Sequence, residues 1–347
     1  MHSSSIHLPL NQSTTLYSIQ YLRAFAALLV VFHHARIPLP WLYDPLAEYK
    51  GLAFGVDIFF VISGFVMYSA AKSENVVEFL RRRIVRIVPL YWIATITLFL
   101  LSEKRNILSI GSDKFLHIAK SLLFIPHWNL GFPSEIWPYL VPGWTLNYEM
   151  FFYFIFAVGL AFRKIEGIVS AGILLLVLIG AVYCPSGAIA STYTSPMLLE
   201  FLFGIWIAIA RERGVVHTPW YPITIGTIGL FLIAPNCPPI SELYVRGIFS
   251  ALVVAGAISA EKHIKYHPLL KALGDGSYSI YLTHFISIGA LKVFWQHIPV
   301  GGMLQFIGYV GSAVIVSSLI GMAVYQWFEK PILKRFGFRR SLNIRRP

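Results

Sequence analysis

The chain of 347 residues alternates between long apolar runs and short polar segments. Ten runs approach or reach the ~20 apolar residues that a helix needs to cross a bilayer, the two shortest being 196–211 and 220–235. The pattern predicts an all-α, polytopic membrane helical bundle of about ten transmembrane helices. The expected spans are 19–36, 52–71, 85–102, 144–163, 167–184, 196–211, 220–235, 243–260, 278–295 and 304–327.

The positions of the cations orient this bundle. Of the 28 Lys and Arg residues, 19 fall on one side of the predicted membrane, 6 fall on the other, and the rest lie within spans. Cytoplasmic loops carry such an excess of Lys and Arg, so both termini are predicted to be cytoplasmic. We expect a polar N-terminal tail over 1–18, a membrane domain over 19–328 and a basic C-terminal tail over 329–347.

Composition agrees with this architecture and excludes several classes of protein. Hydrophobic residues make up 56% of the chain and charged residues 13%, about half the usual share in a soluble domain. The net charge of +12 is explained by membrane topology, so no nucleic-acid partner is expected. Cys184 and Cys237 fall near span ends on one side, which is compatible with a disulfide. Two small apolar residues are the simpler interpretation.

The longest polar interruption, 103–143, lies on the outer side. Within it Phe115, Ile118, Ala119 and Leu122 share one helical face, which predicts a short helix lying at the membrane surface.

Two polar residues share one face of the first span. Arg23 and His34 are eleven residues apart, so both point the same way, about 16 Å apart along the helix. A charge inside a membrane is costly, which makes such a residue a functional candidate by default. His34 alone would more often be a structural histidine, but the arginine in phase with it favours function. His33 faces about 100° away.

Three carboxylates enter the bundle from the outer side, near the expected depth of His34. They are Asp57, Glu149 and Glu200. Asp57 and Glu149 are predicted to be catalytic with His34, because a carboxylate can orient an imidazole. Capping of a helix by Asp57, and a structural hydrogen bond from Glu200, are the alternatives. We expect substrate contacts from polar residues within the spans: Asn147, Tyr153, Glu200 and His284.

A second arginine pair marks the cytoplasmic end of the third span. Arg83 and Arg86 share a helical face, and guanidinium groups are preferred partners of phosphate oxygens. The positive-inside bias explains the neighbouring arginines well, but Arg86 is followed directly by apolar sequence. Arg83, Arg86, Arg23 and Tyr278 are therefore predicted to bind a phosphate-bearing cofactor, and no metal is expected.

These segments resemble the integral-membrane acyltransferase family 3. The motifs occur in order along the chain: Arg23 with His34, GVDIFFVISGF with Asp57, RRRIVRIVPLY with Arg83 and Arg86, WTLNYEMFFY with Glu149, EFLFG with Glu200, GDGSYSIYLTH with His284, and FEKP with Glu329. The GWTLNYEMFFYFIF form is similar to the branch that acetylates bacterial exopolysaccharides and lipopolysaccharides.

The resemblance implies ten spans in a bacterial inner membrane and transfer of an acetyl or short acyl group from acetyl-CoA. The acceptor would be a hydroxyl of a cell-surface or lipid-linked glycan, and membrane lipids would surround the protein. The arginines would bind the CoA phosphates from the cytoplasm. His34 would act either as a general base, oriented by Asp57 or Glu149, or as a transient acyl carrier.

One function of another class stays open at this stage. In a proton-coupled transporter or flippase of lipid-linked sugar, intramembrane carboxylates and histidines relay protons. A purely structural subunit of an export complex would leave the in-phase polar residues unexplained.

Overall fold

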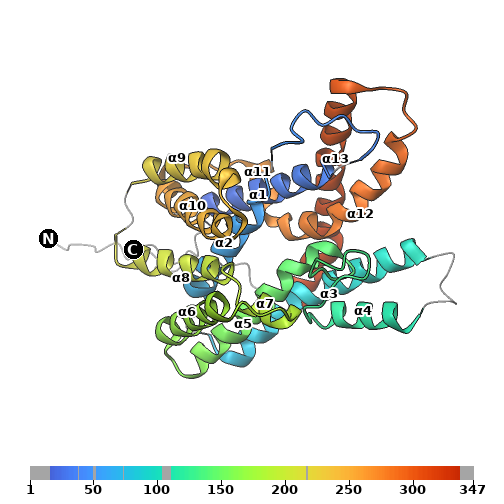
Figure 1. The fold of residues 1–347 in the computed structure, drawn as a ribbon. Coiled ribbons are helices and arrows are strands. Elements are labelled where there is room, and N and C mark those ends of the chain that lie inside the picture. The colour runs from blue at the N-terminus through green and yellow to red at the C-terminus, as the bar shows by residue number, and fades with distance from the viewer. Residues whose placement is uncertain are drawn as a thin grey trace.

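The computed structural model describes residues 16–37, 39–49, 52–72, 74–103, 111–215 and 218–336, and all regular structure in these ranges is helical (Figure 1). The longer helices are α1 (Tyr17–Ala35), α2 (Gly55–Ala71), α3 (Val76–Glu103), α4 (Ser112–Leu122), α5 (Trp144–Ala161), α6 (Ile165–Tyr183), α8 (Leu198–Glu212), α9 (Trp220–Ile228), α10 (Pro239–Ser259), α12 (Ser277–Trp295) and α13 (Gly302–Val324). The shorter ones are η2 (Val141–Gly143), α7 (Ala188–Tyr193), η3 (Gly229–Ile233), η4 (Ala234–Asn236), η5 (Ala260–His263), α11 (Pro268–Asp275), η6 (Tyr325–Glu329) and α14 (Lys330–Arg335).

Every apolar run of the sequence forms a helix, with α9 and η3 sharing the run at 220–235. Five helical stretches are long and apolar enough to cross a membrane, and α2 is a shorter apolar helix. These stretches are Val76–Glu103, Ile165–Tyr183, Ala188–Glu212, Pro239–His263 and Gly302–Arg335. Polar residues lower the hydropathy of α1, α5 and α12. A bundle of ten crossings with cytoplasmic termini therefore stays a prediction.

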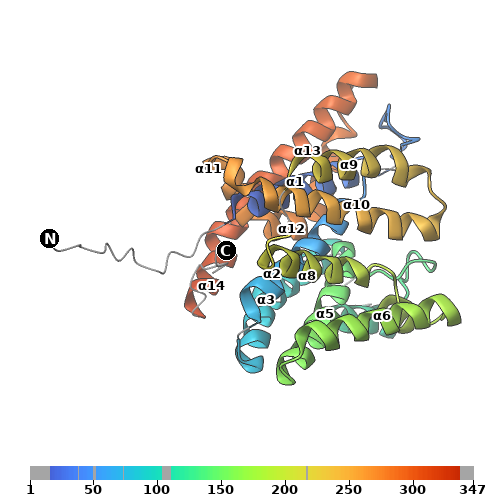
Figure 2. The same ribbon diagram turned by 90° about the vertical axis from the view of Figure 1, so that its left-hand side faces the viewer.

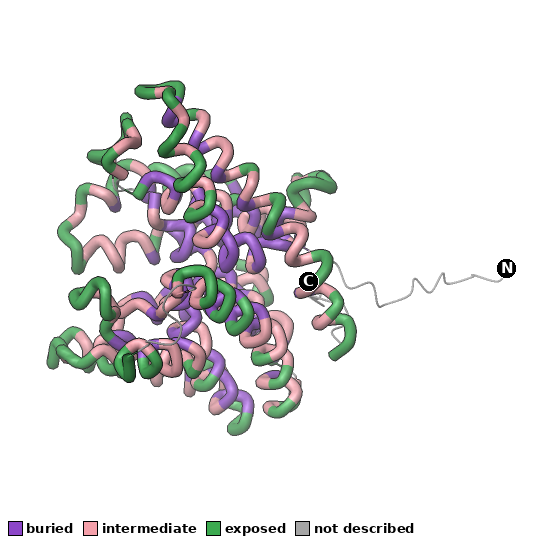
Figure 3. Tube along the Cα trace, turned by 90° about the vertical axis from the view of Figure 1, so that its right-hand side faces the viewer, coloured by how far each residue is buried: buried purple, intermediate pink, exposed green. Residues whose placement is uncertain are grey.

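Apolar side chains cover much of the outer surface of the bundle. In the apolar stretch of α6, only 17% of the residues are buried, and Leu175, Leu178 and Val182 are all exposed. Figure 3 shows the buried residues gathered in the interior and exposed residues along the outer helices. Such a surface is stable only when lipid covers it, as in an integral membrane protein.

The second helix, α2, lies at the centre of the bundle and packs against α1, α8 and α10 (Figures 1 and 2). Its contact with α8 is close because a glycine on each helix meets the other backbone. A Cβ atom at Gly64 would lie 1.9 Å from the Phe201 carbonyl oxygen, and one at Gly204 would lie 2.1 Å from that of Val61. Small residues of this kind let membrane helices approach.

The last helix carries a π-helical turn that buries an acidic residue. The α13 helix continues through η6, where Glu329 is 3% exposed, and then through α14 to Arg335. The helix therefore runs past residue 329, where the sequence placed the start of the basic tail. Residues 337–347, like the predicted N-terminal tail up to residue 15, lie outside the described residues.

The predicted surface helix is present as α4. His117 and Ser121 form its buried face, whereas Phe115 is 71% exposed. Cys184 and Cys237 are both free, so the disulfide compatible with the sequence is not formed.

Candidate active site

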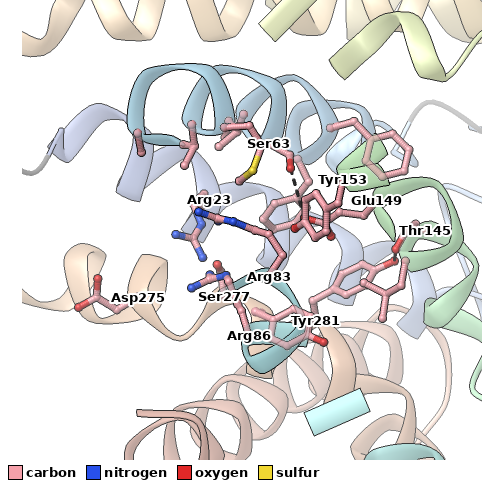
Figure 4. Close-up of a pocket in the computed structure, with 18 of the residues that line it drawn as sticks. Arg23, Ser63, Arg83, Arg86, Thr145, Glu149, Tyr153, Asp275, Ser277 and Tyr281 are labelled. Atoms are coloured by element: carbon pink, nitrogen blue, oxygen red, sulfur yellow. Dashed lines mark hydrogen bonds between the residues drawn. The ribbon is translucent and has the colours of Figure 1, made fainter. Parts of the chain in front are cut away.

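A cavity of about 320 Å³ lies between α1, α2, α3, α5 and α12 (Figure 4). It is within the usual size of small-molecule sites. Its ionisable lining residues are five cations and three carboxylates: Arg23, Arg82, Arg83, Arg86, Lys271, Glu74, Glu149 and Asp275.

Ion pairs neutralise only part of this lining. Arg82 pairs with Glu74 at 2.9 Å, and Lys271 pairs with Asp275 at 2.7 Å. The remaining arginines, Arg23, Arg83 and Arg86, form no ion pair with any described residue. The cavity is therefore left with an excess of positive charge.

The three remaining guanidinium groups gather on one side of the cavity, as Figure 4 shows. Arg83 and Arg86 lie three residues apart on α3 and so share a face, and Arg23 reaches the same space from α1. The Nε of Arg83 is buried without a hydrogen-bond partner among the described residues, and its guanidinium lies 5.5 Å from the Phe79 ring centroid. Unsatisfied buried donors of this kind indicate a site for an anion.

Glu329 supplies counter-charge from behind this cluster. The Ser279 hydroxyl donates a 2.6 Å hydrogen bond to one carboxylate oxygen of Glu329, whose charge also interacts with Arg86 and Arg23. Only the FEKP motif pointed to this residue. A structural role is consistent with its buried position beneath the arginines.

The rest of the cavity wall is more apolar and includes the aromatic ring of Tyr281. Phe59 and Met67 line it from α2, and Glu149 accepts hydrogen bonds from Ser63, at 3.2 Å, and from Tyr153. Tyr281 lines the opposite wall.

Hydrogen bonds hold the two tyrosines of α12 in place. The Tyr281 hydroxyl donates to the Pro142 carbonyl oxygen at 3.0 Å and lies 3.0 Å from the Thr145 hydroxyl. The Tyr278 hydroxyl donates to the Ile87 carbonyl oxygen at 2.8 Å, so Tyr278 lines the cavity but its hydroxyl is engaged elsewhere.

The first-span histidine lies beyond this wall and does not line the cavity. The ring centroid of His34 lies 4.9 Å from that of His284, which in turn lies 5.9 Å from that of Tyr281. Arg23 thus lines the cavity, whereas His34 is related to it only by the ring contacts of His284 with His34 and with Tyr281. The Nδ1 of His34 lies 2.9 Å from the carbonyl oxygen of Val30.

The predicted convergence of three carboxylates on His34 is wrong. Asp57 is fully buried and forms an ion pair with Arg246 of α10, so its carboxylate is not the group that orients His34. Glu200 lies beside Asp57, with both of its carboxylate oxygens buried. Glu149 belongs to the arginine cavity instead, where its charge acts on Arg83 and Arg86.

Two other predicted substrate residues have distinct environments. Tyr153 lines the cavity, whereas Asn147 is buried on α5 and is not part of the cavity wall. No group of three or more potential metal ligands occurs among the residues that the structure describes.

Comparison with known sequences identifies the family. Residues 16–322 match the family described as an acyltransferase domain, which covers most of the chain. The chain belongs to this acyltransferase family. It is 37% identical over 303 residues to the exopolysaccharide production protein ExoZ of Rhizobium meliloti, a match that covers 83% of this chain and 92% of ExoZ.

Two further acyltransferases are more distant. The acyltransferase MdmB of Streptomyces mycarofaciens is 27% identical over 334 residues, covering 83% of this chain and 82% of MdmB. The O-acetyltransferase OatA of Staphylococcus aureus is 25% identical over 366 residues, covering 92% of this chain but 57% of OatA. No solved structure matches this acyltransferase.

One charged residue of this acyltransferase, Arg246, takes part in a buried cluster that helical spacing did not predict. Arg246 lies within an apolar run, as Arg23 does. Unlike Arg23, it was not matched with a second polar residue on the same helical face. Arg246 forms an ion pair with Asp57, the carboxylate that was expected to orient His34.

Proposed function

We propose that this membrane acyltransferase moves an acetyl group from acetyl-CoA to a hydroxyl of a cell-surface or lipid-linked glycan in a bacterial inner membrane. The single observation that carries the proposal is the cluster of Arg23, Arg83 and Arg86, which line one cavity and form no ion pair with any residue that the structure describes. Coenzyme A carries three phosphate groups, and guanidinium groups bind phosphate oxygens with two parallel hydrogen bonds.

The remaining cavity wall suits the uncharged part of the donor. Phe59, Val66 and Met67 present an apolar surface for the pantetheine arm, whose thioester would lie toward Tyr281. Tyr278 would contribute its ring to this wall rather than its hydroxyl, which is bonded to Ile87. Glu149 and its partners Ser63 and Tyr153 would border the same arm.

His34 would carry out the proton or acyl transfer. A carbonyl oxygen only accepts hydrogen bonds, so the Nδ1 of His34 carries the hydrogen that is donated to Val30. The Nε2 of the neutral ring then holds a lone pair, as a general base or a transient acyl carrier requires. The thioester would reach His34 past Tyr281. The positions of Asn147 and Glu200 away from the cavity wall support no acceptor contact from either.

The names of two relatives support the proposed acetyl group and the proposed acceptor. ExoZ is described as an exopolysaccharide production protein, and OatA as an O-acetyltransferase. An exopolysaccharide or lipopolysaccharide hydroxyl is accordingly the acceptor that we propose, and the family favours a transferase over a lipid-linked sugar transporter.

Release of free thiol from acetyl-CoA tests this proposal. Purified protein with acetyl-CoA and a glycan acceptor should release CoA thiol and gain acetyl ester on the glycan. His34→Ala should lower the turnover at least about 10²-fold, the contribution of a general base, and the neighbouring His33→Ala should lower it far less. Transport of a lipid-linked sugar without thioester consumption, or normal turnover in His34→Ala, would contradict the proposal.

A further inference from the structure

His284 is a second histidine that touches His34 and has no assigned partner for one of its nitrogens. It lies on α12 with 0% of its surface exposed, and its ring is tilted by 60° to that of His34 at a centroid distance of 4.9 Å. Its Nδ1 lies 2.5 Å from the Tyr281 carbonyl oxygen. Its Nε2 is buried with no hydrogen-bond partner among the described residues.

The two carbonyl contacts define the protonation pattern of the pair. Since the Tyr281 and Val30 carbonyl oxygens can only accept, the Nδ1 atoms of His284 and His34 both carry hydrogen. In neutral rings both Nε2 atoms therefore hold lone pairs, and neither ring can donate to the other. One additional proton would change this, because a protonated Nε2 on one ring can donate to the Nε2 of the other.

We propose that His284 is a positioning residue that shares the proton which His34 removes from the acceptor hydroxyl. This inference rests on the function proposed above. The only other titratable rings in contact with the pair within the described chain are His33, 5.3 Å from His34, and Tyr281, 5.9 Å from His284.

Atoms and charge balance in this step. The acceptor oxygen forms a bond to the thioester carbonyl carbon as its proton moves to the Nε2 of His34, where the His284 Nε2 accepts a hydrogen bond from it. The carbon–sulfur bond then breaks, and the sulfur leaves with the electron pair. The same proton passes to this sulfur, which gives CoA thiol, the acetyl ester and two neutral histidines.

Two substitutions of His284 differ in whether an acceptor atom remains at the position of Nε2. In His284→Asn the side-chain amide nitrogen takes the place of Nδ1 and can still donate to Tyr281, but no acceptor remains at the position of Nε2. In His284→Gln the amide oxygen can take the place of Nε2. Ser287→Ala, on the same helix as His284, controls for packing, because it removes a buried hydroxyl that bonds to Ser317 of α13 and to the His284 carbonyl oxygen.

We expect His284→Asn to lower kcat by about 10- to 100-fold, the size of a lost hydrogen bond to a charged group, with the KM for acetyl-CoA unchanged. The acid limb of its pH–rate profile should move to lower pH, because the protonated form of His34 is less stabilised. His284→Gln should recover most of the wild-type kcat and the position of the acid limb. Ser287→Ala should have the kcat and pH profile of the wild-type protein.

Wild-type kcat and pH profile in His284→Asn would overturn the inference. Equal losses in the Asn and Gln variants with an unmoved pH profile would also overturn it, because they would show a packing role alone. Neither outcome affects the proposed function, which fails instead if the wild-type protein releases no thiol from acetyl-CoA.

Discussion

At the scale of single residues, consecutive arginines of α3 have different surroundings. Arg81 is exposed and pairs with Glu78 at 3.3 Å, whereas Arg83 is directed into the cavity with a buried, unpartnered Nε. A guanidinium that is held in an interior without a carboxylate costs free energy, unless a ligand supplies the missing partner. The same side-chain type is thus solvated at one position and lines the cavity two residues later.

The matched variants Arg83→Ala and Arg81→Ala test this difference. Arg83→Ala should raise the KM for acetyl-CoA by about 10- to 100-fold, because a charge-assisted hydrogen bond to phosphate is lost, and should leave kcat less affected. Arg81→Ala should change the KM little, since exposed ion pairs contribute little. Steady-state kinetics of thiol release measure both values. Equal KM values in the two variants would remove Arg83 from the donor site.

The sequence predicted some of these residues well and others poorly, for a physical reason. Helical spacing places Arg83 and Arg86 on one face of α3 and indicates the depth of Arg23, and all three line the cavity. Spacing does not define how a helix is rotated relative to its neighbours. Asp57 was therefore placed at the correct end of α2 but assigned to the wrong partner, since α10 brings Arg246 to it.

At the scale of elements, local hydropathy was sufficient to predict the helices but not how they end. Each apolar run is a helix because the hydrogen bonds of a membrane segment must be satisfied within it. The π-helical turns at Gly229–Ile233 and Tyr325–Glu329 carry no comparable signal in the apolar pattern. The second of these turns brings Glu329 beneath the arginines, and only the family motif marked it.

A titratable pair joins α4 to the segment that follows it and links the stability of this helix to pH. The Nε2 of His127 lies 2.9 Å from the Nδ1 of His117, and the Nδ1 of His127 is 2.6 Å from the Ile125 carbonyl oxygen. Burial, with the nearby His127 and Lys120, lowers the pKa of His117 to about 4, and burial also lowers the pKa of His127. The folded pair is therefore neutral at physiological pH.

Acidification should accordingly loosen α4. When α4 opens locally, the exposed His117 ring binds a proton below its ordinary pKa of about 6.5. In the folded helix the same ring stays neutral until about pH 4. The contribution to stability is thus complete above about pH 6.5 and falls as the pH drops from there to about 4. Hydrogen exchange of 112–122, corrected for the intrinsic rate, should be faster at pH 5 than at pH 7.

A variant of His117 separates this effect from general acid sensitivity. His117→Asn keeps a hydrogen-bond donor near the Nδ1 position but does not titrate. The hydrogen-exchange rate of α4 in this variant should therefore depend less on pH than in the wild-type protein. Exchange of α4 that is equally slow at both pH values in the wild-type protein would contradict the role of the pair.

At the scale of the whole molecule, three polar clusters of the described bundle concern the candidate site. These clusters are the arginine cavity, the pair of His34 and His284, and the ion pair of Asp57 with Arg246. The first two adjoin through Tyr281, which lines the cavity and contacts His284. In the proposed function, a donor bound at the arginines would bring its thioester toward the histidines, whereas the ion pair of Asp57 with Arg246 connects α2 to α10.

A cryo-EM structure of the protein with bound CoA would test the central claim most directly. The proposed function predicts phosphate density within hydrogen-bonding distance of Arg83 and Arg86, and the pantetheine arm along α2 with its thiol toward Tyr281. An empty arginine cavity at saturating CoA, or CoA bound at another face of the bundle, would contradict it.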